Sequence, residues 1–566
     1  MGGHVNMMDD VLISNLPPEY LRSALRALLA QGSATQKPFV EHIRQRLQGE
    51  QSPVKDLAQH GLFNKPDEYT PALDRYLTFT RCLICCKLTE ETLSRLKLPL
   101  NSVVEANATW TENSHLYNKL VEFSGDIVQA MQALKEEAPP RTEHLKHSLD
   151  ELSTSLDKLR EYCEKAEISY PFLRSARQVS DLLDSWYPRY GLGDSPNRLG
   201  YLQEELADIQ LSPDPRLEFM TLGPFQVPRL FNGFWQLSSS AWGAASASAQ
   251  DEDLRGLVAA GYTASDMADH YGDAELVYGQ FRNSLPPQVK QQVFAATKWC
   301  VFRPIGRPVT HAWVLEAVQE RCRRLGGRVE LLQFHWYDYG AKEYLEILAE
   351  LVSISKTHPH LVGTIGLCNF DSAHVREACE YLLAKTGTVG LVSNQIQFSV
   401  IDSRPLHQMC DVCATYGLKL LTYGSLCGGL LRENLLNLPM PEMYSATGLL
   451  TPSERKYLSM IRDWGTWDEF QALLGTLRSI GIKHGATPAS VAVRWVLQKP
   501  QVGAVIVGTR LGLSQSTHRR LEIFDFRLSD DDMKEIDHVA LGGGREKTIA
   551  LIEKIGDCGN EYRQMH

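Results

Sequence analysis

The stretch "YTASDMADHYG", from Tyr262 to Gly272, begins as an apolar run and ends in ionisable side chains. A buried β-strand favours apolar residues, whereas ionisable groups at its end are typical of a loop or a functional site. The end of this run brings Asp266, His270 and Tyr271 together. Turn-forming residues are also present here, so a solvated turn is the plain interpretation, and a functional one requires partners elsewhere in the chain.

Short apolar runs recur through the C-terminal part of the chain, and the first seven begin roughly thirty residues apart. The intervals mostly have a helical pattern, for example "THAWVLEAVQERCRRLGG". Eight strand–helix alternations predict a closed (β/α)8 TIM barrel, with a doubly wound open sheet as the alternative. No G-x-G-x-x-G follows any strand, so the usual dinucleotide fingerprint is missing. The runs are "RLFNGFWQL", "YTASDMAD", "QQVFAATKW", "VELLQFHWYD", "LVGTIGLCNF", "GLVSNQIQFSV", "LKLLTYGS" and "VGAVIVGT".

The N-terminal part of the chain has a helical pattern throughout. We expect an all-α accessory domain at residues 1–186, a linker rich in Gly, Pro and Asn at 187–216, and the barrel with a C-terminal tail at 217–566. Apolar residues from Leu145 to Ala166 follow alternating steps of four and three, which form a heptad seam. This seam predicts an antiparallel helical hairpin or a dimeric coiled coil, and the preceding "APPR" break favours the hairpin.

Length and composition limit the class of protein. A chain of 566 residues is expected to form two or three domains, and 43% hydrophobic with 22% charged residues is typical of a globular protein. A net charge of −10 gives no reason to expect nucleic acid or an anionic membrane as a partner. The start has no secretory pattern, no apolar run approaches the ~18–20 residues that span a bilayer, and the cysteines are sparse. We expect a cytoplasmic location.

Two cysteine clusters raise the question of a metal site. The second resembles half of a zinc site, but no second ligand pair follows at a fitting distance. Threefold spacing also places residues on one face of a helix. We therefore expect buried structural thiols and no metal. The clusters are "RCLICCK", with Cys82, Cys85 and Cys86, and "HQMCDVC", with His407, Cys410 and Cys413.

Ionisable side chains follow three consecutive predicted strands. Asp266 and Tyr271 follow the second strand, Lys298 the third and His335 the fourth, and the C-terminal ends of barrel strands meet on one face. A lysine in an apolar strand needs a partner, and Asp266 is the natural one. An ammonium beside a phenol lowers the phenol pKa from about 10, and a histidine can orient a carbonyl oxygen. This combination predicts protonation of an oxygen as hydride reaches its carbon.

The blocks "DMADHYGDAE", "AATKW" and "LLQFHWYD" resemble the three catalytic blocks of the aldo-keto reductases, and the resemblance runs from about Leu217 to the low 540s. It implies Tyr271 as the general acid, tuned by Lys298 and Asp266, with His335 placing the substrate carbonyl. "LEFMTLGPFQVPRLFNGFWQL" resembles the opening hairpin and first strand of that family.

The resemblance also implies a cofactor site for NADPH, with NADH less favoured. "GLCNF" and "NQIQFS" resemble the segments that bind the nicotinamide carboxamide, although Cys368 replaces a serine. "LTYGSLCGGLL" resembles the segment whose tyrosine stacks on nicotinamide, and "IVGTRL" the one that binds the adenosine 2′-phosphate. An adenine-contacting Glu-Asn pair of the family reads Arg519-Arg520 here. The implied cofactor residues are Gly233, Phe234, Asp266, Asn369, Gln395, Tyr423, Ser425, Leu426, Gly508, Thr509 and Arg510.

Two functions are consistent with these features. The first is a carbonyl reductase that converts an aldehyde or ketone to an alcohol. The second is a cofactor-sensing regulatory or scaffold subunit on the same barrel, like the potassium-channel beta subunits. We expect the helical half to lie outside the active site and to serve a protein partner or self-association. The aromatic- and Leu-rich segment 432–470 is expected to be a substrate-facing loop for an apolar or aromatic carbonyl, and the tail after "LGGGREK" to close the pocket's other side.

Overall fold

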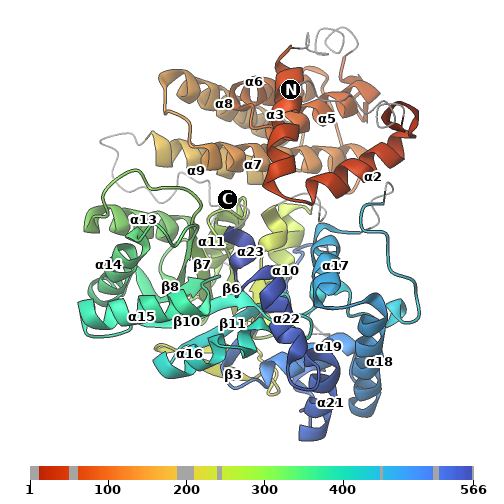
Figure 1. Ribbon diagram of the computed structural model, residues 1–566. Helices are drawn as coiled ribbons and strands as arrows, with labels where there is room; N and C mark the ends of the chain where they lie inside the picture. The colour runs from red at the N-terminus through yellow and green to blue at the C-terminus, as the bar shows by residue number, and fades with distance from the viewer. Residues whose placement is uncertain are drawn as a thin grey trace, which may run out of the picture.

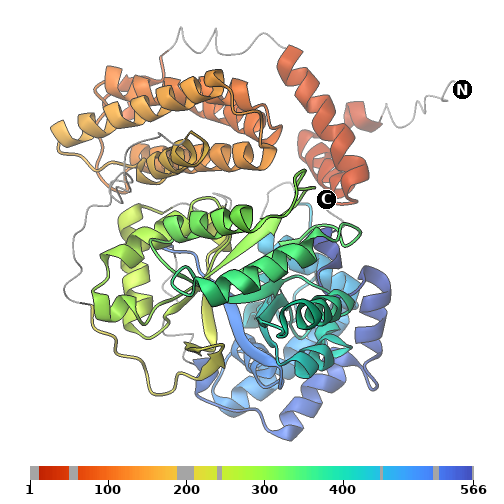
Figure 2. The ribbon, with the colours of Figure 1, turned by 90° about the vertical axis from the view of Figure 1, so that its left-hand side faces the viewer.

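The computed structural model shows a layer of helices above a barrel (Figures 1 and 2). It describes residues 12–49, 61–187, 209–238, 242, 245–445, 450–513 and 522–563. Most of the predicted linker, and the Arg519-Arg520 pair, lie outside these ranges. Among the described residues, we find no helix with the length and apolar character needed to span a bilayer.

Eight parallel strands form the closed barrel, in the spatial order β10-β11-β12-β5-β6-β7-β8-β9. Each of the eight predicted runs coincides with one of them, although β7 continues two residues beyond its run, so the predicted (β/α)8 fold is confirmed. Strands such as β8 are buried along their whole length because side chains pack on both faces, which explains their nearly unbroken apolar sequences. The strands are β5 (Leu230–Gly233), β6 (Ala264–Asp266), β7 (Phe294–Val301), β8 (Val329–Trp336), β9 (Val362–Cys368), β10 (Leu391–Gln397), β11 (Lys419–Tyr423) and β12 (Val502–Gly508).

Helices surround the barrel, and several begin at a Ser, Thr or Asp whose side chain accepts a backbone N–H bond. They pack on the outer faces of the strands in one large apolar cluster. The helices are α10 (Ala247–Ala259), α11 (Ala274–Ser284), α12 (Pro287–Lys290), α13 (His311–Arg324), α14 (Glu343–Thr357), α15 (Ser372–Thr386), α16 (Met409–Tyr416), α17 (Pro452–Trp464), α18 (Trp467–His484), α19 (Pro488–Leu497), α21 (Asp530–Leu541), α22 (Glu546–Ile555) and α23 (Asn560–Arg563).

The amino end of the barrel is closed by the predicted opening hairpin, β3 (Phe219–Leu222) and β4 (Phe225–Pro228). Side chains of this hairpin, including Leu222 and Val227, join interior side chains of the barrel strands in a separate buried cluster. The interior is therefore packed from that end, which leaves the carboxyl ends of the strands for a site.

The helical domain confirms the all-α prediction apart from one small hairpin, β1 (Phe63–Lys65) and β2 (Glu68–Tyr69). It has its own apolar core. In both views it lies over the barrel (Figures 1 and 2). Its helices are α2 (Pro18–Leu29), α3 (Ser33–Gly49), α5 (Pro71–Cys85), α6 (Thr89–Glu105), α7 (His115–Glu137), α8 (Glu143–Lys165) and α9 (Leu173–Trp186).

The predicted leucine seam lies on α8. Its five leucines and Cys163 are buried, whereas Ala166 is exposed at the helix end. The seam packs chiefly against α6 and α9. The seam is therefore buried within one helical bundle of this chain. The favoured hairpin prediction, in which α8 would pack chiefly against the preceding helix α7, is not the observed arrangement.

The segment predicted as a substrate-facing loop is largely helical, because it contains α17 and the start of α18. Each helix begins with a capping box, in which Thr451 pairs with Glu454 and Thr466 with Glu469. The sequences "TPSE" and "TWDE" carry this start signal, which the loop prediction overlooked.

The cysteine clusters correct another expectation. Cys82 and Cys85 are exposed on α5, whereas Cys86 and Cys413 are buried and Cys410 is partly buried. The buried-thiol prediction is therefore wrong for the first two, whose positions face away from the helical core.

Candidate active site

Asp266 and Lys298 form a buried ion pair at the carboxyl ends of β6 and β7. Lys298 Nζ lies 2.6 Å from Asp266 Oδ2 and donates to the Met267 carbonyl at 2.8 Å. The two residues are only 3% and 2% exposed. Burial alone would lower the pKa of the Lys298 ammonium, but Asp266 and Tyr271 hold that pKa above its usual value. The lysine therefore remains charged.

Asp266 is also fixed by two amides inside the barrel. Gln333 Nε2 and Gln395 Nε2 donate to Asp266 Oδ1 at 2.8 and 2.7 Å, and Gln395 also donates to Gln333 Oε1 at 2.8 Å. The resemblance assigned Gln395 to the nicotinamide carboxamide, but its Nε2 here orients the carboxylate. Sequence reasoning missed Gln333, although a polar residue within "VELLQFHW" was the available signal.

Tyr271 lies beside this pair, on the loop that follows β6. The Lys298 ammonium is 4.7 Å from the centroid of the Tyr271 ring. Burial raises the pKa of the Tyr271 phenol, Lys298 opposes that rise, and Asp266 adds to it. The expected net lowering of this pKa is therefore wrong, because desolvation outweighs the neighbouring ammonium. The phenol keeps its proton at neutral pH, which suits a proton donor.

His335, near the end of β8, completes the predicted set. Its ring is 3% exposed and lies 5.4 Å, between centroids, from the ring of Phe302. The register of the sheet pairs His335 with Cys300, two residues after Lys298. The barrel thus gathers Asp266, Tyr271, Lys298 and His335 on one face, where sequence reasoning expected them.

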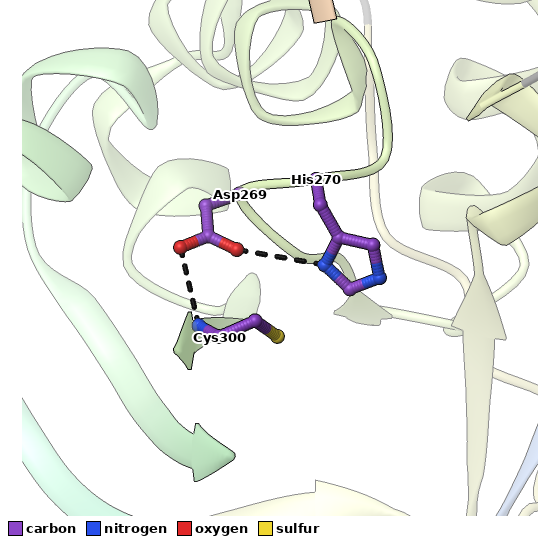
Figure 3. A group of neighbouring side chains, drawn as sticks. All are labelled: Asp269, His270 and Cys300. Carbon is purple, nitrogen blue, oxygen red and sulfur yellow. Dashed lines mark hydrogen bonds and ion pairs between the residues drawn. The ribbon is translucent and has the colours of Figure 1, made fainter. Parts of the chain in front are cut away.

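The loop that carries Tyr271 is supported by Asp269, His270 and Cys300 (Figure 3). Asp269 Oδ1 lies 3.5 Å from His270 Nδ1, and Asp269 Oδ2 accepts the Cys300 N–H at 3.2 Å and binds Arg321. The potential ligand atoms of the three residues lie within 4.8 Å of one another. However, Arg321 already balances the carboxylate, and burial raises the pKa of the Cys300 thiol well above normal. The cluster therefore fits loop support better than a metal centre.

Asn369 and Tyr423 lie together at the ends of β9 and β11. The Tyr423 hydroxyl donates to Asn369 Oδ1 at 2.9 Å. Asn369 adopts a left-handed conformation with φ of 58°, which asparagine tolerates better than most residues. The amide and the phenol expected at a nicotinamide ring are therefore neighbours.

The C-terminal tail lies over these two residues, as Figure 1 shows for α23 between the helical layer and the barrel. The Tyr562 hydroxyl is 3.1 Å from that of Tyr423 and accepts from Lys456 Nζ at 2.7 Å. The Tyr562 ring centroid is 6.5 Å from the ring centroids of both His335 and Tyr423. Arg563 Nη1 donates to the Asn369 carbonyl at 2.8 Å. Sequence reasoning expected the tail near the pocket but did not identify these residues.

The expected phosphate end of the site lies under the helical domain. Arg510 is exposed and lines an open cleft together with barrel residues, residues of α7 and Arg174 of α9. Thr509, by contrast, is buried and its hydroxyl donates to the Val507 carbonyl at 3.1 Å. The residues expected at the phosphate thus line an open cleft, whereas those expected at the nicotinamide lie under the tail.

The other residues implied for the cofactor are mostly structural in this conformation. The Phe234 ring is fully buried against Tyr278, and the buried Ser425 hydroxyl donates to the Phe398 carbonyl at 2.8 Å. Leu426 packs partly buried against the barrel core. Gly233 and Gly508 pair with each other at the ends of β5 and β12. Only their backbone can face a ligand.

Comparison with known proteins places this geometry in a family. The model of the aldo/keto reductase family matches residues 229–541. Flagellar radial spoke protein 5 of Chlamydomonas reinhardtii is 29% identical over 181 residues, which cover 30% of this chain and only 33% of that protein. Aldo-keto reductase YhdN of Bacillus subtilis is 23% identical over 334 residues, which cover 56% of this chain and 90% of the relative. A solved thermostable aldo-keto reductase in complex with epalrestat has 20% identity and a TM-score of 0.40, covering 57% of this chain and 100% of that one.

Proposed function

The chain belongs to the aldo/keto reductase family, a family of oxidoreductases that use nicotinamide cofactors, and from that membership we propose that it reduces an aldehyde or ketone to an alcohol. The observation that carries the proposal is the buried Lys298–Asp266 pair beside a protonated Tyr271. A lysine charge is costly to bury unless it is paired, and this pair is placed next to a potential proton donor.

The residues present fit a nicotinamide dinucleotide at two separate places. Arg510 offers a guanidinium to the cleft under the helical domain, which suits a phosphate. Asn369 and Tyr423 offer an amide and an aromatic ring for the nicotinamide. At that second place, Tyr562 and Lys456 stand in front of Tyr423, so binding there requires the tail to move.

In the proposed reaction, the protein residues handle the carbonyl oxygen. A bound reduced nicotinamide supplies the hydride for the carbonyl carbon. Tyr271 transfers its phenolic proton to the oxygen, the C=O π bond becomes an O–H bond, and a phenolate remains. Lys298 stabilises that phenolate by its charge, and Asp266 holds the ammonium in place. His335 orients the carbonyl oxygen before the transfer. Water returns a proton to Tyr271 afterwards.

We propose NADPH as the preferred cofactor, because Arg510 can bind a 2′-phosphate that NADH lacks. An apolar or aromatic carbonyl is the proposed substrate, since the rings of Phe302 and Tyr562 lie 5.4 and 6.5 Å, between centroids, from the ring of His335. A cytoplasmic location and a partner for the helical domain stay predictions.

A second candidate function is a cofactor-sensing or scaffold subunit with slow turnover. The specific observation that favours it is the position of Tyr562, between His335 and Tyr423. A chain that fills its own nicotinamide site turns over slowly unless the tail is displaced. The similarity to a protein named for the flagellar radial spoke is consistent with this candidate.

Purified full-length protein separates the two candidates. We expect NADPH consumption with at least one member of a broad panel of aldehydes and ketones, measured by absorbance of the reduced nicotinamide. NADPH binding without turnover of any panel member would support the sensing subunit. Absence of binding to both cofactors would contradict both candidates and support a purely structural role.

A further inference from the structure

We propose that the helical domain is part of the active site, because Arg174 on α9 positions the loop that carries Tyr271. The consequence for turnover rests on the proposed function, whereas the positioning itself does not. Arg174 does not contact the reacting atoms, so its role is that of a positioning residue.

Arg174 joins two loops of the barrel through one guanidinium. Its Nε donates to Asp273 Oδ2 at 2.8 Å, and its Nη2 donates to Asp273 Oδ1 in a second, parallel bond. Asp273 follows Tyr271 by two residues. The same Nη2 also donates to the Leu237 carbonyl at 3.4 Å, in the segment that follows β5. A bidentate pair defines direction as well as distance, so the guanidinium holds the loop in one geometry.

Two further contacts of the helical domain reach the residue after Tyr271. Gln178, one turn along α9, donates to the Gly272 carbonyl at 3.4 Å. Gly272 has φ of 60°, and a Cβ at this position would lie 3.2 Å from Val128 Cγ1 of α7. The helices therefore touch the backbone on the C-terminal side of the proposed proton donor.

The Arg174–Asp273 pair is shielded from water. The Asp273 side chain is 0% exposed and the Arg174 side chain 12% exposed. Removing one member of such a pair leaves the other as an uncompensated buried charge. Asp273 would then have to move toward water, and Tyr271 lies on the same short loop. Loss of Arg174 is therefore expected to release the loop rather than leave it unchanged.

A second buried carboxylate, Asp181, holds α9 in place against the barrel. Asp181 is 0% exposed and binds Lys135 of its own domain at 2.9 Å, together with Arg323 and Arg324 of α13. Burial by itself would raise the pKa of Asp181, but Arg324, Lys135 and Arg323 hold that pKa well below its usual range. Because α13 follows β7, which carries Lys298, α9 is anchored to the elements on both sides of the catalytic pair. The proposal therefore stands against the expectation that the helical half lies outside the active site, and the experiment below decides between them.

The test compares Arg174→Ala, Arg174→Lys and the control Arg303→Ala in the full-length chain. Arg303 is exposed and donates to the Glu137 carbonyl, so it joins the same two domains through a different barrel loop, the one that follows β7. Hydrogen exchange is measured on peptides that cover residues 266–280, where the amides of Tyr271 and Ala274 report on the loop. Turnover, KM and NADPH affinity are measured on the same samples.

We expect Arg174→Ala to increase exchange in residues 266–280 by roughly tenfold or more, with the barrel strands unchanged. We expect kcat to fall by about tenfold or more while KM for the carbonyl stays within about threefold, because a displaced donor affects the transition state more than binding. NADPH affinity is a separate readout, because Arg174 lines the same cleft as Arg510. Arg174→Lys, which keeps the charge but not the bidentate geometry, should restore part of both properties.

Wild-type exchange in residues 266–280 of Arg174→Ala would overturn the proposal, whatever the turnover. Equal acceleration in Arg303→Ala would also overturn it, because the effect would then report general loosening between the domains. If Arg174→Ala does not fold, Gln178→Ala decides in the same exchange measurement, and the outcomes are read in the same way. If the wild-type chain reduces no carbonyl, the proposed function fails, while the exchange result still decides the positioning.

Discussion

The helical domain and the C-terminal tail both cover the carboxyl end of the barrel, but the residues that lie nearest the site, Asp273 and Tyr562, are held by different interactions. The helical domain is held by charges with no solvent exposure, Asp181 and Asp273, each paired with arginine. The last turn of the tail is half-buried, and its Tyr562 makes hydrogen bonds to a phenol and a lysine. In the same turn, Glu561 pairs with the buried Arg404 at 3.0 Å and Arg563 with Asp371 at 3.3 Å.

This difference indicates which cover can move. Breaking a buried ion pair by removing one partner costs about 3–5 kcal/mol, whereas an ordinary hydrogen bond contributes about 0.5–1.5 kcal/mol. We therefore expect the helical domain to stay in place beside Tyr271. The Tyr562 side chain, which hydrogen bonds hold over Tyr423, is the part of the tail that we expect to move, whereas ion pairs hold Glu561 and Arg563 on either side of it. The carboxyl end of the barrel is thus covered by the helical domain, which we expect to stay in place, and by Tyr562, which we expect to move.

The largest effect is expected from Tyr271→Phe, which tests whether the two covers surround a working site. Loss of the proton donor should reduce carbonyl reduction by roughly 10²–10⁴-fold, and NADPH binding should stay near normal. Steady-state kinetics and a cofactor titration measure the two quantities. Unchanged turnover would remove Tyr271 from the reaction.

Removal of the helical domain should reduce turnover nearly as strongly and should also reduce stability. A chain that begins near Leu217 lacks Arg174 and exposes Asp273, so we expect turnover to fall by about tenfold or more and stability to fall by about 3–5 kcal/mol. Denaturant unfolding and kinetics on the same preparation measure both. A truncated chain with full-length stability and turnover would show that the helical half is an accessory after all.

Arg510→Ala tests the proposed phosphate-binding cleft, which lies under the helical domain. Loss of a charge-assisted contact should weaken NADPH by about 1.5–3 kcal/mol, and NADH, which lacks the 2′-phosphate, should be little affected. Calorimetric titration with each cofactor gives the comparison. Equal weakening of both cofactors would mean that Arg510 is structural or that Arg519 and Arg520 bind the phosphate.

Tyr562→Phe tests the cover over Tyr423 and should have a smaller effect, because it should raise NADPH affinity and not lower it. The substitution removes the hydrogen bonds of one hydroxyl but keeps the ring, so the closed form should lose about 1 kcal/mol. NADPH affinity should then rise by about fivefold, because less of the protein is closed. A matched control is Tyr337→Phe, a residue that has none of these contacts. Weaker cofactor binding in Tyr562→Phe would mean that the tail holds the cofactor rather than excluding it.

The smallest effect concerns pH. Tyr271 donates in its protonated form, and burial raises its pKa, so it stays protonated up to a higher pH than a free phenol. We therefore expect kcat for reduction to change by less than about twofold between pH 7 and pH 9. A decline of kcat centred within this range would indicate a donor with a lowered pKa, as the sequence alone suggested.

Much of the site could be predicted from local patterns. Apolar runs alternating with helical segments determined the eight strands, and the topology of a barrel then brings the side chains after β6, β7 and β8 to one face. Asp266 could be matched with Lys298 because a lysine in a buried strand needs a counter-charge. The start signals of α17 and α18 were also present in the sequence, although they were not used.

The sequence by itself therefore determined the barrel, the helical character of the N-terminal part and the gathering of Asp266, Tyr271, Lys298 and His335. Only the tertiary structure decided that Arg174 reaches Asp273, that Tyr562 lies in front of Tyr423, and that the Tyr271 pKa rises. The physical reason is range. Strand and helix patterns depend on neighbours along the chain, whereas contacts between distant segments and the loss of water around a phenol depend on how whole domains pack.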